Sequence, residues 1–426
     1  MTEYERVFAV AAANLVVGPG ATRELGDHAA ELGLRRVLLL TDRRLRSLAP
    51  VEIALASIRR CAIEVEIFDE VVVEPTDRSF LHAAEVASAG AYDGLVAVGG
   101  GSTIDTAKAA NLYATYPADL LAYVNPPIGQ GLPPPGPLRP LIAVPTTAGT
   151  GSETTGVAIF DLPDLHAKTG IAHRRLRPTL AIVDPDNTRT LPPMVAAASG
   201  FDVLSHALES YTALPYDQRI APPDPSRRPA YQGSNPFSDL WAERAISMVT
   251  TALPRAVADG SDDDARAAMC MAATYAGIGF GNAGVHLPHG MSYAVSGGVR
   301  TYRAGGYPPD RALVPHGMSV ILSAPSVFRW TAPGSPQRHL RAAELLGCDV
   351  RGVGPEDAGG LIAERLIAMM RQTGIPNGLE AVGYTPTDAS ALAAGTLPQH
   401  RVTKLSPRPA SEADLEALFV GALRYW

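Results

Sequence analysis

The chain has 426 residues, of which 46% are hydrophobic, and a formal net charge of −7 from 36 basic and 43 acidic side chains. This balance argues against a nucleic acid or an anionic membrane as the main ligand, since either would favour a basic surface, and a small molecule fits better. A chain of this length usually organises more than one core, so we expect two domains that share a cleft.

The N-terminal segment MTEYERVFAV has neither the basic flank nor the apolar run of a secretion signal. No later stretch has the length of a membrane span. We therefore expect a cytoplasmic protein that has no mitochondrial leader, does not bind a membrane and acts on small molecules. A homo-oligomer is compatible with the sequence.

Short apolar runs alternate with helix-length segments in the first part of the chain. Each run is bounded by glycine or polar residues, which is typical of buried parallel strands. The runs are residues 36–42, 62–68, 94–98, 141–144 and 180–183. We therefore predict an α/β domain with a parallel sheet over residues 1–190.

The strand signal fades in the second part of the chain, where alanine- and leucine-rich stretches such as 262–277 and 357–372 dominate. These stretches predict an all-helical domain over residues 191–426. Two proline-rich insertions, 125–140 and 215–236, are expected to form loops, because proline fixes φ and removes a hydrogen-bond donor.

A glycine turn follows the predicted strand 94–98 and runs directly into a predicted helix. It consists of Gly99, Gly100, Gly101 and Ser102, with Asp105 in the first turns of the helix. Glycine lets the backbone approach a ligand, and a helix N-terminus offers free N–H groups that suit a pyrophosphate. The run is not a GxGxxG fingerprint, and a turn of this kind is also an ordinary connection between strand and helix.

A second loop rich in glycine and hydroxyl groups follows the predicted strand 141–144 and contains Thr146, Thr147 and Thr150. The two loops follow neighbouring strands and so lie at one edge of a parallel sheet, where α/β proteins bind their ligands. The pair predicts a dinucleotide site more strongly than either loop does alone.

Asp42 ends the first of the predicted strands. Its carboxylate could accept hydrogen bonds from an adenosine ribose and repel a 2′-phosphate, which favours NAD over NADP. The residue precedes the glycine turn, so the usual Rossmann order does not apply, and Arg43 and Arg44 weaken the inference. A capping aspartate is the alternative interpretation.

Asp202 and His206 stand four residues apart in a run that predicts a helix, so both side chains lie on one face and can share a cation. A pair with this spacing alone is more often an ordinary surface contact. His289 and His316 strengthen the hypothesis, because both occur in glycine-rich apolar segments where an unpaired imidazole is costly to bury. His286 lies close to His289, and spacing does not choose between them.

One carboxylate with three imidazoles suits a divalent ion such as Fe²⁺ or Zn²⁺. Thiolate ligands are not expected, since Cys61, Cys270 and Cys348 stand far apart without a CxxC spacing. We interpret the cysteines as structural thiols in a reducing compartment.

These residues together make the sequence resemble the iron-containing (group III) alcohol dehydrogenases and, within them, the hydroxyacid-oxoacid transhydrogenases. The resemblance covers nearly the whole chain and implies an α/β cofactor domain followed by a helical metal domain. It also implies which residues act. The metal ligands would be Asp202, His206, His289 and His316, which decides against His286, and the two glycine-rich loops would bind the cofactor. Lys168 resembles a family lysine near the cofactor, so the resemblance implies a cofactor-binding and catalytic role for it, and an exposed loop lysine is its alternative interpretation.

The sequence departs from most of that family at Tyr293, where relatives carry a second histidine. This departure is shared with the transhydrogenase branch. The segments 228–236 and 395–405 also resemble that branch, and general family members lack them. The resemblance implies that 4-hydroxybutyrate is oxidised to succinate semialdehyde while 2-oxoglutarate is reduced to 2-hydroxyglutarate, with NAD tightly bound throughout.

Both implied substrates carry a carboxylate away from the reacting carbon, so a basic group is expected nearby. The candidates are Arg227, Arg228, Arg401 and Lys404, each of which could instead be a solvated surface charge.

Two alternatives to a transhydrogenase stay open at this point: an ordinary NAD-dependent alcohol dehydrogenase, and a catalytically silent nucleotide-binding protein. The retention of all four candidate ligands argues against the silent protein.

Overall fold

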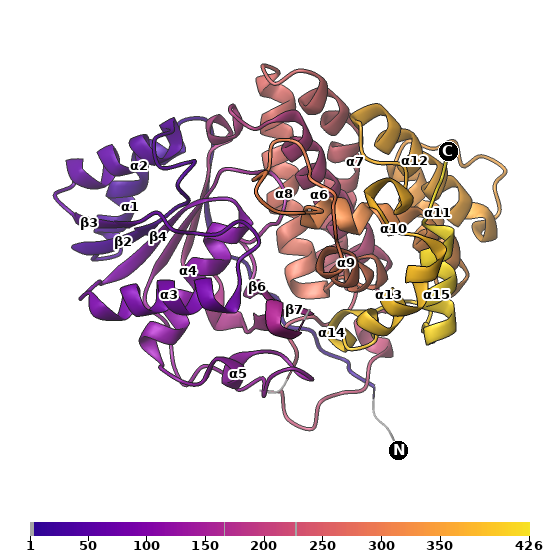
Figure 1. Cartoon of the computed structure of the whole chain (residues 1–426), viewed down its shortest axis with the longest axis horizontal. Helices are drawn as coiled ribbons and strands as arrows, with labels where there is room; N and C mark the ends of the chain where they lie inside the picture. Colours follow the sequence, from indigo (N-terminus) through magenta and orange to yellow (C-terminus); the bar gives the residue numbers. More distant parts are fainter. Residues whose placement is uncertain (1–3, 166, 226–227) are drawn as a thin grey trace. The chain divides into compact units, whose positions relative to one another are not determined.

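A computed structural model of the chain describes residues 4–165, 167–225 and 228–426, which form two compact units (Figure 1). One unit runs from Ala12 to Thr190, and the other contains Leu191–Trp426 together with the N-terminal residues up to Ala11. The sequence placed this N-terminal segment in the α/β domain. It lies with the helical unit because the backbone N–H groups of Ala9 and Ala11 donate to Gln232 Oε1 (2.8 Å) and Asn282 Oδ1 (2.9 Å).

The α/β unit contains a parallel sheet in the strand order β1-β8-β5-β4-β2-β3 and a separate antiparallel hairpin of β6 and β7. The expected parallel sheet is confirmed. β1, β6 and β7 were not predicted. The strands are β1 Asn14–Val17, β2 Arg36–Leu40, β3 Glu64–Phe68, β4 Gly94–Gly99, β5 Leu141–Pro145, β6 Val157–Leu162, β7 Ala167–Ala172 and β8 Leu180–Val183.

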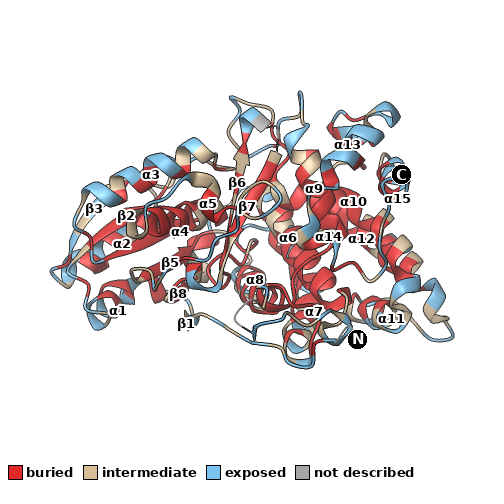
Figure 2. Cartoon of the chain, turned by 90° about the horizontal axis from the view of Figure 1, so that it is seen from below, coloured by how far each residue is buried: buried red, intermediate tan, exposed pale blue. Residues whose placement is uncertain are grey.

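Helices cover both faces of the parallel sheet, because alternate residues of each strand point to opposite sides. In β4, Val96 and Val98 pack in one apolar cluster with residues of α1 and α2, whereas Leu95 and Ala97 pack in another with residues of α3 and α4. In Figure 2, α4 is buried along most of its length and α3 has an exposed outer face. The helices are α1 Leu25–Glu31, α2 Ala49–Arg60, α3 Asp77–Ala89, α4 Gly101–Thr115 and α5 Leu120–Tyr123.

The second unit is helical, as expected, and α6 lies at its centre. This helix is buried over most of its length and packs against α7, α8 and α10. In the described part of the chain, none of the helices combines the length and the apolar character that a membrane crossing requires. The helices are α6 Pro193–Thr212, α7 Pro236–Ala258, α8 Asp263–Ala283, α9 Leu287–Gly297, α10 His316–Thr331, α11 Pro336–Leu345, α12 Ala358–Thr373, α13 Ala389–Thr396, α14 His400–Thr403 and α15 Glu412–Gly421.

Candidate metal centre

The central helix α6 carries Asp202 and His206 one turn apart on the same face. Proline at its first position suits a helix start, because the missing N–H would have no partner within the helix. Both side chains are almost fully buried, with 1% of Asp202 and 4% of His206 exposed. A carboxylate and an imidazole this deep in a helical core need polar or ionic partners.

Two further helices supply the partners. His289 lies in the first turn of α9, and His316 is the first residue of α10. Gly317 allows the start of α10 to approach α6 closely, because a Cβ at this position would lie 2.1 Å from the backbone oxygen of Ala198. The N-terminal turns of α9 and α10 therefore aim two imidazoles at the Asp202 side chain.

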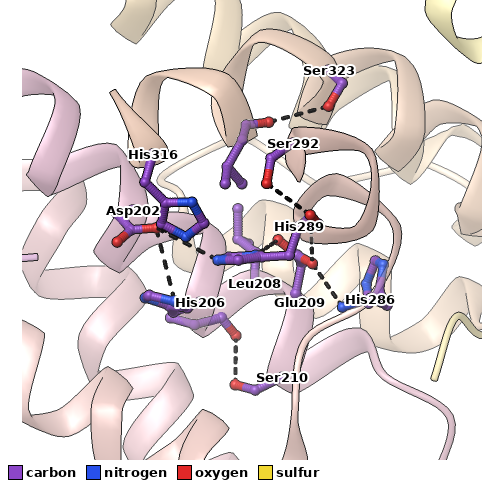
Figure 3. Close-up of polar contacts among 12 residues, drawn as sticks. Asp202, His206, Leu208, Glu209, Ser210, His286, His289, Ser292, His316 and Ser323 are labelled. Atoms are coloured by element: carbon purple, nitrogen blue, oxygen red, sulfur yellow. Dashed lines mark hydrogen bonds and ion pairs between the residues drawn. The ribbon is translucent and has the colours of Figure 1, made fainter. Parts of the chain in front are cut away.

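The four predicted ligands converge on one point, with Asp202 Oδ1 at its centre (Figure 3). The Nε2 atoms of His206, His289 and His316 lie 3.8, 3.5 and 3.7 Å from Asp202 Oδ1. One ligand atom from each of the four residues lies within 4.8 Å of the others. Among the described residues, Asp202 Oδ1 and His289 Nε2 are buried and have no hydrogen-bond partner. The donor set and these unsatisfied atoms fit a divalent cation.

The electrostatics of the cluster also favour a positive charge there. Burial opposes ionisation of Asp202, but the imidazoles of His206 and His316 outweigh it and hold the pKa of the carboxyl well below its usual value. Burial lowers the pKa of His206 to about 3, so this imidazole is neutral and can act as a ligand. Burial also opposes a charge on His289, but the Glu209 carboxylate outweighs it and raises the pKa of that imidazole to about 9.

Glu209, which the sequence analysis missed, holds His289 in place from the side away from Asp202. Its side chain is fully buried, and its Oε1 lies 2.6 Å from His289 Nδ1. Its Oε2 accepts hydrogen bonds from the backbone N–H groups of His286 (2.7 Å) and His289 (3.3 Å). A bond of this kind fixes which ring nitrogen of a histidine faces a metal. The sequence signal that could have revealed Glu209 is its position in an apolar run, three residues after His206 on the same predicted helix.

His286, the competitor that spacing alone left open, points elsewhere. Its Nε2 lies 3.0 Å from the hydroxyl oxygen of Thr212. Within the described chain, the ligand cluster around Asp202 contains His289 and not His286.

The two glycine-rich loops of the α/β unit touch each other at the ends of β4 and β5. A Cβ on Gly101 would lie 2.5 Å from Thr150 Cγ2, and one on Gly100 would lie 3.3 Å from Thr147 Cγ2. The backbone N–H of Thr146 donates to the oxygen of Gly99 at 3.0 Å. Glycine backbone without side chains and the hydroxyl groups of threonine therefore lie together at the N-terminus of α4. A dinucleotide site at this edge of the sheet requires such an arrangement.

Two predicted cofactor residues in this region make protein contacts of their own. Asp105 accepts from the Ser152 hydroxyl and, at 2.9 Å, from the backbone N–H of Ile159, so it ties the second loop to β6. The hydroxyl of Ser102 accepts from the backbone N–H of Glu74 at 3.1 Å. These contacts give both residues a role in shaping the loops, and their contact with a cofactor stays a prediction.

Asp42 and Lys168 are also engaged within the α/β unit. Asp42 accepts from the backbone N–H groups of Arg44 (2.8 Å) and Leu45 (3.1 Å), which is the capping contact that the alternative interpretation described. Lys168 lies in β7, where its Nζ is 2.5 Å from Glu74 and 2.9 Å from Asp161. Lys168 is buried rather than an exposed loop lysine. The cofactor role of Asp42 and the catalytic role of Lys168 stay predictions.

The four basic candidates for carboxylate binding differ in their surroundings. Arg227 lies outside the described residues. Arg228 forms an ion pair with Glu5 at 3.0 Å, and Lys404 is exposed. Arg401 is half-buried and makes no ion pair with a carboxylate of the described chain.

Solved structures share this architecture. A crystal structure of 1,3-propanediol oxidoreductase is 30% identical in sequence and superposes with a TM-score of 0.86 over 98% of this chain and 100% of that one. An alcohol dehydrogenase from Oenococcus oeni is 26% identical, with a TM-score of 0.85. The fold and the buried carboxylate–imidazole cluster together define a metal-dependent oxidoreductase.

Family models make this assignment specific. The model described as iron-containing alcohol dehydrogenase matches residues 12–185, and the model described as Fe-containing alcohol dehydrogenase family, C-terminal, matches residues 230–423. The chain belongs to the iron-containing alcohol dehydrogenase family. The mitochondrial hydroxyacid-oxoacid transhydrogenase of Xenopus tropicalis is 53% identical over 100% of this chain and 92% of that protein, and the protein of that name from Homo sapiens is 52% identical.

The expected cytoplasmic location is wrong. The relatives at 52–53% identity are named as mitochondrial proteins, which points to mitochondria rather than to the cytoplasm. The expectation relied on the composition of the segment MTEYERVFAV, and this composition does not determine the compartment in which the folded enzyme works.

Proposed function

We propose that this enzyme is a hydroxyacid-oxoacid transhydrogenase that uses a divalent metal ion and tightly bound NAD. The proposal depends most on one observation, the convergence of ligand atoms from Asp202, His206, His289 and His316 within 4.8 Å. It is supported by full-length relatives that carry that name. The proposed substrates are 4-hydroxybutyrate, which is oxidised to succinate semialdehyde, and 2-oxoglutarate, which is reduced to 2-hydroxyglutarate.

Asp202 and the Nε2 atoms of the three histidines would hold the ion, with Glu209 fixing the orientation of His289. We propose Fe²⁺, and Zn²⁺ accepts the same ligands. A bound divalent ion acts as a Lewis acid on the substrate oxygen, and NAD accepts and returns the hydride. The protein supplies a buried carboxylate and three imidazoles whose ligand atoms already lie within 4.8 Å of one another, an arrangement that needs no large rearrangement to bind the ion.

The glycine-lined edge of the α/β unit would hold the cofactor. The N-terminus of α4 presents backbone N–H groups to a pyrophosphate, and the absence of side chains at Gly100 and Gly101 lets the phosphates approach. Thr147 and Thr150 flank this backbone and offer hydroxyl groups. The carboxylate oxygen of Asp42 that takes no part in the capping contact would accept from the adenosine ribose, which favours NAD over NADP.

The two half-reactions balance within one active site. The alcohol carbon of 4-hydroxybutyrate gives up a hydride and its hydroxyl gives up a proton, which leaves succinate semialdehyde. The keto carbon of 2-oxoglutarate receives that hydride and its oxygen receives a proton, which forms 2-hydroxyglutarate. Because NAD is retained, the second substrate regenerates the oxidised cofactor and none is consumed.

A coupled assay without free NAD tests the proposal. Metal-reconstituted protein, loaded with NAD and then freed of unbound cofactor, is given 2-oxoglutarate and 4-hydroxybutyrate that carries deuterium on its alcohol carbon. We expect 2-hydroxyglutarate that carries the deuterium, over many turnovers per enzyme, because the deuteride passes to 2-oxoglutarate from a cofactor that stays bound to the enzyme. Mass spectrometry of the product measures the transfer.

The same assay distinguishes the alternatives. An ordinary NAD-dependent dehydrogenase of this family would stop after about one turnover per bound NAD and resume only when NAD⁺ is supplied. A silent nucleotide-binding protein would form no product under either condition. The transhydrogenase proposal is abandoned if cofactor-loaded, metal-replete enzyme forms no 2-hydroxyglutarate.

A further inference from the structure

Arg401 lies beside the helix that carries His289. It belongs to the short helix α14, which packs on α9 at Gly290, the residue that follows His289. A Cβ on Gly290 would lie 2.8 Å from Thr403 Cγ2, so a larger residue there would push α14 away. This close packing fixes the position of Arg401 relative to one of the candidate metal ligands.

The guanidinium of Arg401 rests on two tyrosines. Its Nη2 donates to the hydroxyl oxygen of Tyr293 at 3.2 Å, and its central carbon lies 4.9 Å from the centre of the Tyr231 ring. Its Nη1 is buried and makes no hydrogen bond to any described residue. No carboxylate of a described residue forms an ion pair with Arg401, so none of the described carboxylates neutralises its positive charge. A buried cationic N–H without a partner is costly, and an anionic ligand would remove that cost.

Both tyrosines are linked to candidate metal ligands, Tyr293 by direct ring contact and Tyr231 through Phe280. The ring of Tyr293 stacks with that of His316 at a centroid distance of 6.3 Å. The ring of Tyr231 meets Phe280 edge-on at 6.4 Å, and Phe280 in turn stacks on His206 at 3.8 Å. Arg401 is thus connected through aromatic contacts to two of the four candidate ligands.

We propose that Arg401, framed by Tyr231 and Tyr293, binds the carboxylate that a substrate carries away from its reacting carbon. A guanidinium presents planar paired N–H donors that match a carboxylate, which an ammonium or a neutral side chain does not. The ligand class is an aliphatic acid a few carbons long, and the same subsite serves the hydroxyacid and the oxoacid in turn. This inference rests on the proposed function, because it assigns one part of the substrate to one residue.

Arg401→Gln and Arg401→Lys in the holoenzyme test the proposal through a comparison of two alcohols. The first is 4-hydroxybutyrate, and the second is 1,4-butanediol, which lacks the carboxylate. For Arg401→Gln we expect the KM for 4-hydroxybutyrate to rise by about 10- to 100-fold, the range for a lost charged hydrogen bond. The kcat/KM for 1,4-butanediol should change little. Arg401→Lys keeps the charge without the paired donors and should fall between wild type and Arg401→Gln.

Arg408→Gln is the matched control, because Arg408 also lies over an aromatic ring, that of Trp330 at 4.2 Å, and is exposed. It should leave both substrates unaffected. Metal content and the melting temperature of each variant show whether it folds. If Arg401→Gln does not fold, the comparison of the two alcohols is made with Arg401→Lys.

Calorimetric titration with glutarate separates this inference from the proposed function, because binding requires no turnover. A loss of glutarate affinity in Arg401→Gln, with wild-type metal content, supports the subsite even if the coupled assay yields no product. Equal glutarate affinity and equal KM in wild type and both Arg401 variants, or no binding of glutarate to the wild type, overturns it even if transhydrogenation is observed.

Discussion

The Asp202→Asn variant is expected to lose its metal ion and at least about a thousandfold in turnover, because Lewis-acid catalysis supplies several kcal/mol. Asparagine keeps the shape of the side chain but removes the only negative charge among the four candidate ligands. In the wild type, Asp202 Oδ1 lies between 3.5 and 3.8 Å from all three Nε2 atoms, so an ion held by the three imidazoles would also contact this oxygen. Metal content by mass spectrometry and turnover in the coupled assay are the measurements.

Asp239→Asn is the control for Asp202→Asn. Asp239 is partly buried in the same helical unit, but its partner is Arg338, at 2.6 Å. This variant should keep its metal and its turnover, whatever it loses in stability. If Asp202→Asn retains stoichiometric metal and wild-type turnover, the carboxylate is not a ligand and the assignment of the site is wrong.

The Glu209→Gln variant is expected to bind its metal about 10- to 100-fold more weakly, the usual cost of removing the partner of a metal-bound histidine. Glutamine keeps the size of the side chain but loses the charge that faces His289 Nδ1 at 2.6 Å. Its amide nitrogen would face either the backbone N–H groups that now donate to Glu209 Oε2 or the ring of His289. In the second case it would donate to Nδ1 and leave the ring proton on Nε2, the nitrogen that has to bind the metal. Competition with a chelator measures the affinity.

A purely structural role for Glu209 would give a different result. Substitution of Co²⁺ makes the ligand geometry visible in the absorption spectrum, which should shift in Glu209→Gln if His289 is no longer held in position. Glu243→Gln is the control, because Glu243 pairs with Arg341 at 2.9 Å and is not part of the cluster. An unchanged metal affinity and Co²⁺ spectrum, with a lower melting temperature alone, would reduce Glu209 to a folding role.

The central strands were predictable because they are apolar on both faces. β2, β4 and β5 are covered on each side by helices, so their sequences are continuous apolar runs. β1 was missed because it is only four residues long and partly exposed, which leaves no clear pattern. β7 was missed because its sequence, AKTGIA, contains a lysine and a glycine whose place in a strand depends on pairing with β6.

The metal ligands were predictable because polar residues in apolar segments need partners. Asp202 and His206 share a helix face by their spacing alone, but the convergence of His289 and His316 depends on how α9 and α10 pack, which spacing does not encode. For Arg228, the sequence did not reveal the partner that the structure shows. Its sequence neighbours gave no sign of Glu5, a partner more than 200 residues away, and this ion pair removes the charge that a substrate would need.

Anomalous diffraction from crystals of the metal-loaded protein, recorded at the absorption edges of iron and zinc, tests the central claim most directly. We predict a single strong peak per chain, in contact with Asp202 Oδ1 and with the Nε2 atoms of His206, His289 and His316. A peak at any other position, or full activity in protein without a peak at these four side chains, would contradict the account.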